Sequence, residues 1–287
     1  MSNCFSDEFF IFFTQFFLLK KLIYIFVCVK LWLCFSLYKK NIYAKRLGDK
    51  MFILEGNIGA GKSTFLKLIE KAYSDIPVVQ EPHENWFTPM EGMSLFEKFY
   101  HDPTRWAYTT ETLVMMSRVK DHLRAQLNNH SSAIMERSVY SGHYCFAVNG
   151  FNSGYFSELE WDAYSKILEF MVKEQCKIPQ GFIYLRVNPD VCRERICKRN
   201  RKGEEDLSQD YLLKIHELHE NFLIKKIGIF DALKSVPVLI LDGGEDFVDS
   251  PQVFEQHLMR VREFIAQTQM VQNILAAKSS AKSSLNI

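Results

Sequence analysis

The chain has 287 residues, of which 47% are hydrophobic and 24% are charged, and its net charge is +1. This length suits one large α/β domain or two small ones, with enough apolar residues for a substantial core. Because no broad basic face is expected after residue 50, nucleic acid is excluded as an expected partner, whereas small anionic ligands are not.

The first fifty residues differ from the rest. They hold nine of the 24 Phe residues, and eight Lys and Arg against three Asp and Glu. The stretch 22–38 comes closest to a membrane helix, which needs about 20 apolar residues, but Lys30 interrupts it. Three readings stay open for residues 1–50: a translated upstream region before a start at Met51, a membrane anchor, or an unusual targeting peptide.

The seven cysteines are scattered along the chain, and no C-x-x-C pair occurs. This spacing excludes a zinc ribbon or a thioredoxin-type site and indicates reduced thiols. We therefore expect a cytoplasmic enzyme, with a mitochondrial or membrane-anchored location only if residues 1–50 are expressed.

From residue 51 onward, short apolar runs alternate with long amphipathic stretches. Strands are predicted over 51–55, 76–80, 133–136, 181–187 and 236–241. Helices are predicted over 62–73, 92–100, 105–128, 138–149, 157–176, 189–201, 208–226 and 251–268. Apolar strands separated by helices are typical of a parallel sheet covered on both faces, so we expect a three-layer α/β fold with a five-stranded parallel sheet over 51–268. The remaining segment, 269–287, is predicted to be a flexible tail.

A glycine-rich loop follows the first predicted strand: residues 56–63 read GNIGAGKS. The pattern G-x-x-x-x-G-K-S between a strand and a helix is typical of a P-loop, in which backbone N–H groups enclose phosphate oxygens. Lys62 would bridge the β- and γ-phosphates, and Ser63 would ligate Mg²⁺. The pattern predicts a P-loop NTPase-type fold that binds a nucleoside triphosphate, without distinguishing an ATPase, a GTPase or a kinase.

Charged residues follow the later strands, at the edge of the sheet where ligands are expected. Glu81 would accept a proton from an attacking hydroxyl. Glu136 would hold magnesium, and Arg137 would orient the acceptor or the transferring phosphoryl group, although each alone is compatible with a surface ion pair. The basic helix 189–201 followed by the acidic loop 203–206 is typical of a lid that closes over phosphates, or of a solvated face.

Together these motifs resemble the deoxynucleoside kinase family, which includes the deoxycytidine, deoxyguanosine and mitochondrial thymidine kinases and the insect multisubstrate kinase. The matching segments cover most of the chain, from about Met51 to Gln267. They are EGNIGAGKSTF, EPHENW, DPTRWAYTTETLVMMSR, ERSVYSGHYCF, YLRVNPDVCRERICKRNRKGEED, YLLKIHELHENFL and VLILDGGEDF. The resemblance implies a nucleotide-salvage transferase that moves the γ-phosphoryl group of ATP, with Mg²⁺, to the 5′-hydroxyl of a deoxynucleoside, and it implies a homodimer.

For the acceptor, the resemblance implies a pocket built around the predicted general base. Glu81 and Arg137 would contact the 5′-hydroxyl, Tyr100 and Glu204 would hold the 3′-hydroxyl, and Phe146 would stack on the base. The residues implied for binding the nucleoside are Glu81, Trp86, Phe96, Tyr100, Glu111, Arg118, Arg137, Gly142, Phe146 and Glu204.

For the donor, the resemblance implies contacts with the P-loop, the lid and a loop after the last strand. The residues implied for binding ATP are Gly56, Asn57, Ile58, Gly59, Ala60, Gly61, Lys62, Ser63, Thr64, Arg195, Arg199, Arg201, Asp246 and Phe247. Lys62 would also be catalytic, and Ser63 and Glu136 would hold Mg²⁺.

Two departures from the family pattern bear on the base. The family usually has Gln where this chain has Glu111. Its purine- and cytosine-using members have an Arg at the position of Arg118 and pair it with an Asp where this chain has Gly142. A carboxylate offers only acceptors, which suit the two adjacent donors of guanine better than the donor–acceptor edges of adenine and cytosine. Arg118 would donate to guanine, with Glu111 as its counter-charge. We therefore expect a preference for deoxyguanosine or another purine deoxynucleoside.

Two alternatives stay open. A nucleoside monophosphate kinase of the thymidylate kinase type has a similar fold, but it needs basic residues for the acceptor's phosphate, and the segment 81–86 has no Lys or Arg. A non-catalytic P-loop nucleotide-binding protein would keep Lys62 but would not need Glu81 or the complete lid.

Overall fold

A computed structural model describes most of the chain after residue 50. All described residues belong to one unit, Asp49–Ile287. They are residues 51–73, 76–81, 92–127, 132–201, 204 and 207–284. Residues 1–50 lie outside this set, so the three readings of that segment stay predictions. Within the described ranges, no helix is both long and apolar enough to cross a bilayer.

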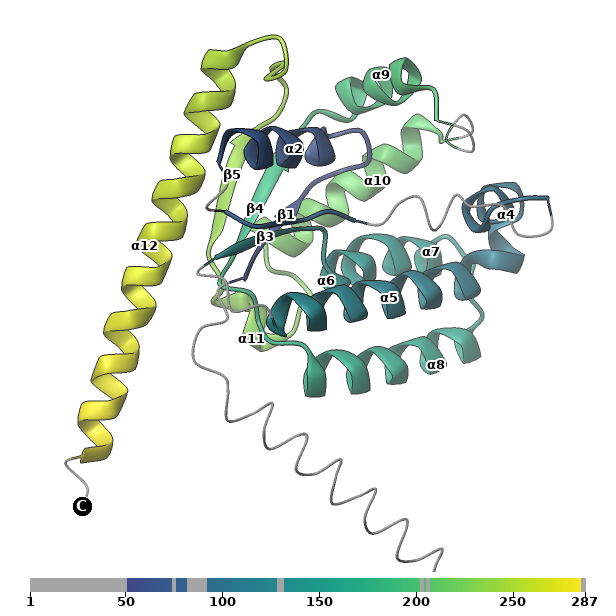
Figure 1. Cartoon of the computed structure of the whole chain (residues 1–287). Helices are drawn as coiled ribbons and strands as arrows, with labels where there is room; N and C mark the ends of the chain where they lie inside the picture. Colours follow the sequence, from purple (N-terminus) through teal and green to yellow (C-terminus); the bar gives the residue numbers. More distant parts are fainter. Residues whose placement is uncertain are drawn as a thin grey trace, which may run out of the picture. The chain divides into compact units, whose positions relative to one another are not determined.

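A five-stranded parallel sheet forms the centre of this unit (Figure 1). Its strands are β1 (Met51–Glu55), β2 (Val78–Val79), β3 (Ala133–Glu136), β4 (Gly181–Arg186) and β5 (Val238–Asp242). Their order is β2-β3-β1-β4-β5, and every neighbouring pair is parallel. The predicted α/β fold is confirmed, and the strand that precedes the P-loop lies in the middle of the sheet.

Helices connect the strands and cover both faces of the sheet (Figure 1). The α-helices are α2 (Lys62–Ala72), α4 (Leu95–His101), α5 (Pro103–Leu127), α6 (Val139–Ser141), α7 (Val148–Asn152), α8 (Glu158–Leu168), α9 (Pro189–Arg199), α10 (Gln209–His219), α11 (Asp231–Lys234) and α12 (Pro251–Ser284). Three π-helical segments are η1 (Gly142–Ala147), η2 (Glu169–Lys173) and η3 (Glu220–Ile224).

The alternation of side chains along β1 explains the three layers. Phe52 and Leu54 pack with apolar residues of α2 and α12 on one face, whereas Met51 and Ile53 pack with residues of α5, α8 and η1 on the other. All four side chains are buried. A strand that is apolar at its first four positions therefore serves two cores, as expected for a parallel sheet covered on both faces.

The regular helices predicted over 138–149, 157–176 and 208–226 each contain one of the π-helical segments. Hydrophobic periodicity does not predict the extra residue per turn, because the apolar face continues through it. This departure from a regular α-helix matters most in η1, because η1 carries Gly142 and Phe146 of the predicted nucleoside pocket.

The last helix is longer than predicted. The expected end at residue 268 is wrong: α12 continues to Ser284, so the segment predicted as a flexible tail is helical up to that residue. The small, polar composition suggested fraying, but no Gly or Pro follows Pro251, and Ala, Gln, Lys and Leu all favour helix. The short helix α11 was not predicted, because four residues are too few to establish a period.

Candidate active site

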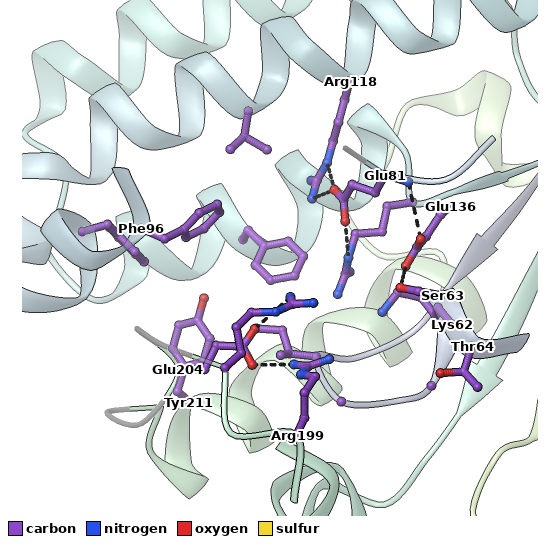
Figure 2. Close-up of a pocket in the computed structure, with 18 of the residues that line it drawn as sticks. Lys62, Ser63, Thr64, Glu81, Phe96, Arg118, Glu136, Arg199, Glu204 and Tyr211 are labelled. Atoms are coloured by element: carbon purple, nitrogen blue, oxygen red, sulfur yellow. Dashed lines mark hydrogen bonds and ion pairs between the residues drawn. The ribbon is translucent and has the colours of Figure 1, made fainter. Parts of the chain in front are cut away.

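One cavity of about 270 Å³ lies at the carboxyl ends of the strands, where ligands bind in parallel sheets (Figure 2). Its walls come from the P-loop and α2, from α4 and α5, and from the segments that follow β2, β3 and β4. The lining residues are Ile58, Gly59, Gly61, Lys62, Ser63, Thr64, Lys67, Glu81, Phe96, Phe99, Tyr100, Glu111, Val114, Arg118, Glu136, Arg137, Phe146, Arg199, Arg201, Glu204 and Tyr211. Most residues predicted for catalysis and for nucleoside binding therefore meet in one place.

The P-loop needs glycine at two positions for different reasons. Gly59 has a φ of +78°, and a Cβ there would overlap the carbonyl oxygen of Cys192. Gly61 has a φ of +92°, a backbone conformation that side chains rarely adopt, and directly precedes α2. A glycine loop in front of a helix N-terminus is the arrangement that binds phosphate through backbone N–H groups.

Lys62 is buried at the start of α2 (Figure 2). Its Nζ donates to the carbonyl oxygens of Gly56, at 3.1 Å, and Asn57, at 2.8 Å. Burial and, to a lesser extent, the nearby charge of Arg137 lower the pKa of Lys62 to about 7, against the opposing effect of the nearby carboxylates. A polyphosphate in this cavity would favour the charged ammonium, because an opposite charge stabilises it.

Ser63 and Glu136 form an oxygen-rich corner beside Lys62. The Ser63 hydroxyl donates to Glu136 Oε1 at 2.6 Å, and the backbone N–H of Glu81 donates to Glu136 Oε2 at 3.4 Å. A hydroxyl and a carboxylate at the mouth of the P-loop are the hard oxygen ligands that Mg²⁺ prefers, so this corner fits that ion.

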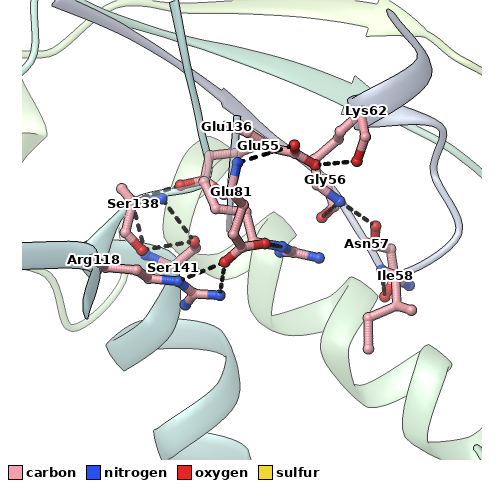
Figure 3. A network of polar contacts seen from close by, with 12 residues as sticks. Glu55, Gly56, Asn57, Ile58, Lys62, Glu81, Arg118, Glu136, Ser138 and Ser141 are labelled. Atoms are coloured by element: carbon pink, nitrogen blue, oxygen red, sulfur yellow. Dashed lines mark hydrogen bonds and ion pairs between the residues drawn. The ribbon is translucent and has the colours of Figure 1, made fainter. Parts of the chain in front are cut away.

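Glu81 is held by two guanidinium groups (Figures 2 and 3). Arg118 donates from Nε and Nη2 to Oε1, at 2.9 and 2.7 Å, and Arg137 Nε lies 3.4 Å from Oε2. The Arg137 backbone has a φ of +59°, and its N–H donates to the carbonyl oxygen of Leu54 at 2.9 Å. A carboxylate held in place by two guanidinium groups at the edge of this cavity has the position that a general base needs.

Glu204 joins the lid to the cavity. Its carboxylate accepts from Arg199 at 2.5 Å and from Arg201 at 3.3 Å. Burial raises the pKa of the Tyr100 hydroxyl, and the carboxylates of Glu204 and Glu111 raise it further, so this hydroxyl stays neutral and able to donate. At this end of the pocket, Tyr100, Arg199 and Arg201 are therefore hydrogen-bond donors, and Glu204 is an acceptor.

Aromatic rings line the middle of the cavity. The centroid of the Phe146 ring lies 4.8 Å from the guanidinium carbon of Arg137 and 5.7 Å from that of Arg118. Phe96 stands against Tyr100 with ring centroids 5.9 Å apart. These faces form an apolar wall suited to a planar ring.

Glu111 is a buried carboxylate in the wall of the cavity. Burial raises the pKa of Glu111 to about 7, against the opposing charge of Arg118. Within the part of the chain that the structure describes, its side chain makes no hydrogen bond or ion pair. A ligand with hydrogen-bond donors would supply what this side chain lacks.

The residues predicted on the donor side divide into two groups. Ile58, Gly59, Gly61, Arg199 and Arg201 line the cavity, together with the residues of α2 already described. Gly56, Asn57, Ala60, Arg195, Asp246 and Phe247 do not line it. Trp86, predicted for the nucleoside pocket, lies outside the described residues.

Arg195 ties two loops together rather than facing the cavity. Its guanidinium donates to the carbonyl oxygens of Ala60 in the P-loop, at 3.3 Å, and of Gly243 after β5, at 2.8 Å. Phe247 is buried below the same P-loop and stands edge-on to Phe65, with centroids 5.5 Å apart. These two residues fix where the loop after β5 sits.

Sequence reasoning missed several residues of this region, among them Lys67, Phe99 and Val114 in the cavity wall. Tyr211 of α10 lines the cavity, and Glu55 lies completely buried at the end of β1, where it accepts from the Ser138 hydroxyl at 2.6 Å (Figure 3). Burial raises the pKa of Glu55. Its position directly before the P-loop was a signal, because acids rarely end a buried strand without a partner.

Comparison with known proteins agrees with this geometry. The model of the family described as deoxynucleoside kinase matches residues 52–266. Deoxycytidine kinase 2 from Gallus gallus is 37% identical, over 78% of this chain and 92% of that protein. The mitochondrial deoxyguanosine kinase of Xenopus laevis is 34% identical over 77% and 92%, and human deoxycytidine kinase is 33% identical over 76% and 91%. The chain therefore belongs to the deoxynucleoside kinase family, and it is a deoxynucleoside kinase.

Proposed function

We propose that this kinase transfers the γ-phosphoryl group of Mg·ATP to the 5′-hydroxyl of a deoxynucleoside, with a preference for deoxyguanosine or another purine deoxynucleoside. The reaction is supported above all by Glu81, a buried carboxylate held by two arginines in the same cavity as the P-loop. The base preference rests on Glu111.

Glu81 accepts the proton of the 5′-hydroxyl while that oxygen attacks the γ-phosphorus and the bond to the β-phosphate oxygen of ATP breaks. The products are a deoxynucleoside monophosphate and ADP. Lys62, Arg199 and Arg201 supply positive charge toward the phosphoryl group in transit, where developing charge is stabilised. Tyr100 and Glu204 are the proposed contacts for the 3′-hydroxyl, and Phe146 for the face of the base.

Ser63 and Glu136 would hold Mg²⁺, which supplies charge neutralisation at the β- and γ-phosphates when it is bound. Arg195, Asp246 and Phe247 act on the donor less directly in this proposal. Arg195 donates to carbonyl oxygens on both the P-loop and the loop after β5, and Asp246 Oδ1 accepts from the N–H of Val248 at 2.9 Å. They shape the loop that borders the donor.

The preference for guanine follows from the hydrogen bonds that Glu111 is able to make. When ionised, it accepts from two adjacent donors, which guanine presents and adenine and cytosine do not. When neutral, it has one donor and one acceptor, like Gln. Because the pKa of Glu111 is about 7, both forms occur near neutral pH, and a donor-rich base favours the ionised one.

The test is phosphate transfer from Mg·ATP to each of the four deoxynucleosides, with Glu81→Gln as the control. Deoxyguanosine should rank first, and the variant should lose roughly 10²–10⁴-fold in kcat, the usual contribution of a general base. Because Gln keeps the shape of the side chain, ATP binding should stay unchanged in the variant. Activity on a nucleoside monophosphate but on no nucleoside would instead favour the thymidylate kinase type and would remove Glu81 as the base.

We also propose a cytoplasmic homodimer. The neighbouring helices α5 and α8 expose large apolar side chains, namely Leu113 and Met116 on α5 and Leu159 on α8, 78% exposed. Large apolar side chains exposed on neighbouring helices are suited to burial against a second copy. Light scattering of Leu113→Asp against the native protein tests this, and a native protein that elutes as a monomer at micromolar concentration would refute it.

A further inference from the structure

Glu55 is a buried carboxyl that the proposed reaction does not use. It ends β1, directly before the P-loop, and its side chain is completely buried. It is not among the residues that line the cavity. Burial of a carboxyl is unfavourable unless the group is hydrogen-bonded, so a polar partner is expected for it.

That partner is the hydroxyl of Ser138, which follows Arg137 in the chain (Figure 3). Ser138 Oγ donates to Glu55 Oε1 at 2.6 Å, and it accepts the backbone N–H of Ser141 at 3.1 Å as the N-cap of α6. Both serines are completely buried. Because the Ser138 hydroxyl is used as a donor and as an acceptor, it ties the start of α6 to the end of β1.

A second hydrogen bond ties the same two segments one residue earlier. Strands β1 and β3 pair with Leu54 opposite Glu136, and the N–H of Arg137 donates to the carbonyl oxygen of Leu54 at 2.9 Å. Two consecutive residues after β3 are therefore held by two consecutive residues at the end of β1: Arg137 by Leu54, and Ser138 by Glu55.

The backbone of Arg137 depends on such support. Its φ of +59° is a left-handed conformation that residues with a side chain rarely adopt. A conformation of this kind persists only where the surrounding structure fixes it. It places the guanidinium with Nε 3.4 Å from Glu81 Oε2 and the guanidinium carbon 4.8 Å from the centroid of the Phe146 ring. Relaxation of this backbone would move the guanidinium away from both groups.

We infer that Glu55 is a positioning residue for Arg137: by accepting the Ser138 hydroxyl, it holds the left-handed backbone that directs the guanidinium toward Glu81 and the reacting hydroxyl. The inference rests on the proposed function, in which Arg137 contacts the 5′-hydroxyl. It gives the residue that precedes the P-loop a task at the acceptor end of the cavity, although its neighbours in the sequence serve the donor end.

The test begins with the full-length variants Glu55→Ala and Glu55→Gln. Glu55→Ala removes the acceptor and should lower kcat by roughly tenfold, the equivalent of one hydrogen bond, with the KM for ATP unchanged. Glu55→Gln keeps an acceptor oxygen at the same reach and should retain kcat within about twofold. If Glu55 only supported the P-loop that follows it, Glu55→Ala would raise the KM for ATP instead.

A cycle with Arg137→Ala shows whether Glu55 acts through Arg137. In that background, Glu55→Ala should cause no further loss of kcat beyond about twofold, because the guanidinium that it positions is absent. Ser138→Ala removes the same hydrogen bond from the donor side. It should reproduce the loss in the native background only, and it carries the test if Glu55→Ala does not fold. Equal losses with and without the guanidinium, or a Glu55→Gln protein as slow as Glu55→Ala, would overturn the inference.

A matched control is Glu220→Ala. The Glu220 carboxylate also accepts from a hydroxyl, that of Tyr184 at 2.9 Å, and from a guanidinium, that of Arg186 at 2.8 Å, but it does not line the cavity. Loss of this carboxylate should leave kcat unchanged in the native and Arg137→Ala backgrounds. A loss as large as that of Glu55→Ala would show that the cycle reports only general destabilisation.

The cycle is measured with the acceptor that the native protein phosphorylates fastest, so it gives a result whatever that acceptor is. If Glu81→Gln retained activity, the proposed base would be wrong, and the coupling between positions 55 and 137 would still decide this inference. If Glu81→Gln were inactive and the losses at positions 55 and 137 were additive, the inference would fall and the proposed function would stand.

Discussion

The two ends of the cavity are built in different ways. The donor end comes mainly from one continuous segment, residues 56–64, in which loop and helix follow each other in the sequence. The acceptor end combines Glu81, Arg118, Arg137, Glu204 and Phe146, which come from five separate parts of the chain. A contiguous site can be recognised as a motif, whereas an assembled site depends on how the elements pack. Substitutions at the two ends should therefore have separable effects.

After Glu81→Gln, the largest effect is expected at the donor end. Lys62→Met should reduce kcat by roughly 10²–10³-fold, the usual loss when one group that stabilises transition-state charge is removed. Because Lys62 is proposed to contact the phosphates rather than the base, the loss should be similar for all four deoxynucleosides. Steady-state rates with each nucleoside measure this. A loss confined to one base would contradict the separation of the two ends.

The next largest effect is expected at the acceptor end. Glu111→Gln should lower the preference for deoxyguanosine over deoxyadenosine by roughly 10–100-fold in kcat/KM, the range for a hydrogen bond to a charged group. The KM for ATP should not change. The base proposal fails if the ranking of the four deoxynucleosides is the same in Glu111→Gln as in the native enzyme.

The same residue predicts how the ranking depends on pH. With its pKa raised to about 7, Glu111 is mostly neutral at pH 6 and mostly ionised at pH 8. The ratio of kcat/KM for deoxyguanosine to that for deoxyadenosine should therefore rise between these values. In Glu111→Gln the ratio should be flat, since Gln does not titrate, and a slope that persists there would assign the titration to another group.

A smaller effect is expected where the P-loop meets the loop after β5. Arg195→Ala removes hydrogen bonds to the carbonyl oxygens of Ala60 and Gly243, so the donor-side loop should be held less firmly. We expect the KM for ATP to rise by roughly tenfold or less, the equivalent of one or two hydrogen bonds, with the KM for the nucleoside unchanged. A change in nucleoside ranking would show that Arg195 also acts on the acceptor end.

Several features of the acceptor end were beyond reach from the sequence. Arg118 was expected to donate to the base with Glu111 as its counter-charge, and instead it donates to Glu81. The reason is spatial: only the packing of α5 against η1 shows that the volume beside Gly142 is taken by the guanidinium. Likewise, Phe247 was predicted for the donor but is buried on Phe65, which no local pattern indicates.

By itself, the sequence determined the five parallel strands, the P-loop and the family, because these depend on local patterns: apolar runs, glycines and residues at fixed spacing. It also pointed to most residues of the cavity, since residues that follow parallel strands meet at one edge of the sheet. The tertiary structure alone decided which charges pair, how deeply Lys62 and Glu111 are buried and hence why their pKa values move toward neutrality. Burial and charge pairing depend on every element packed around a side chain, so the residues next to it in the sequence do not predict them.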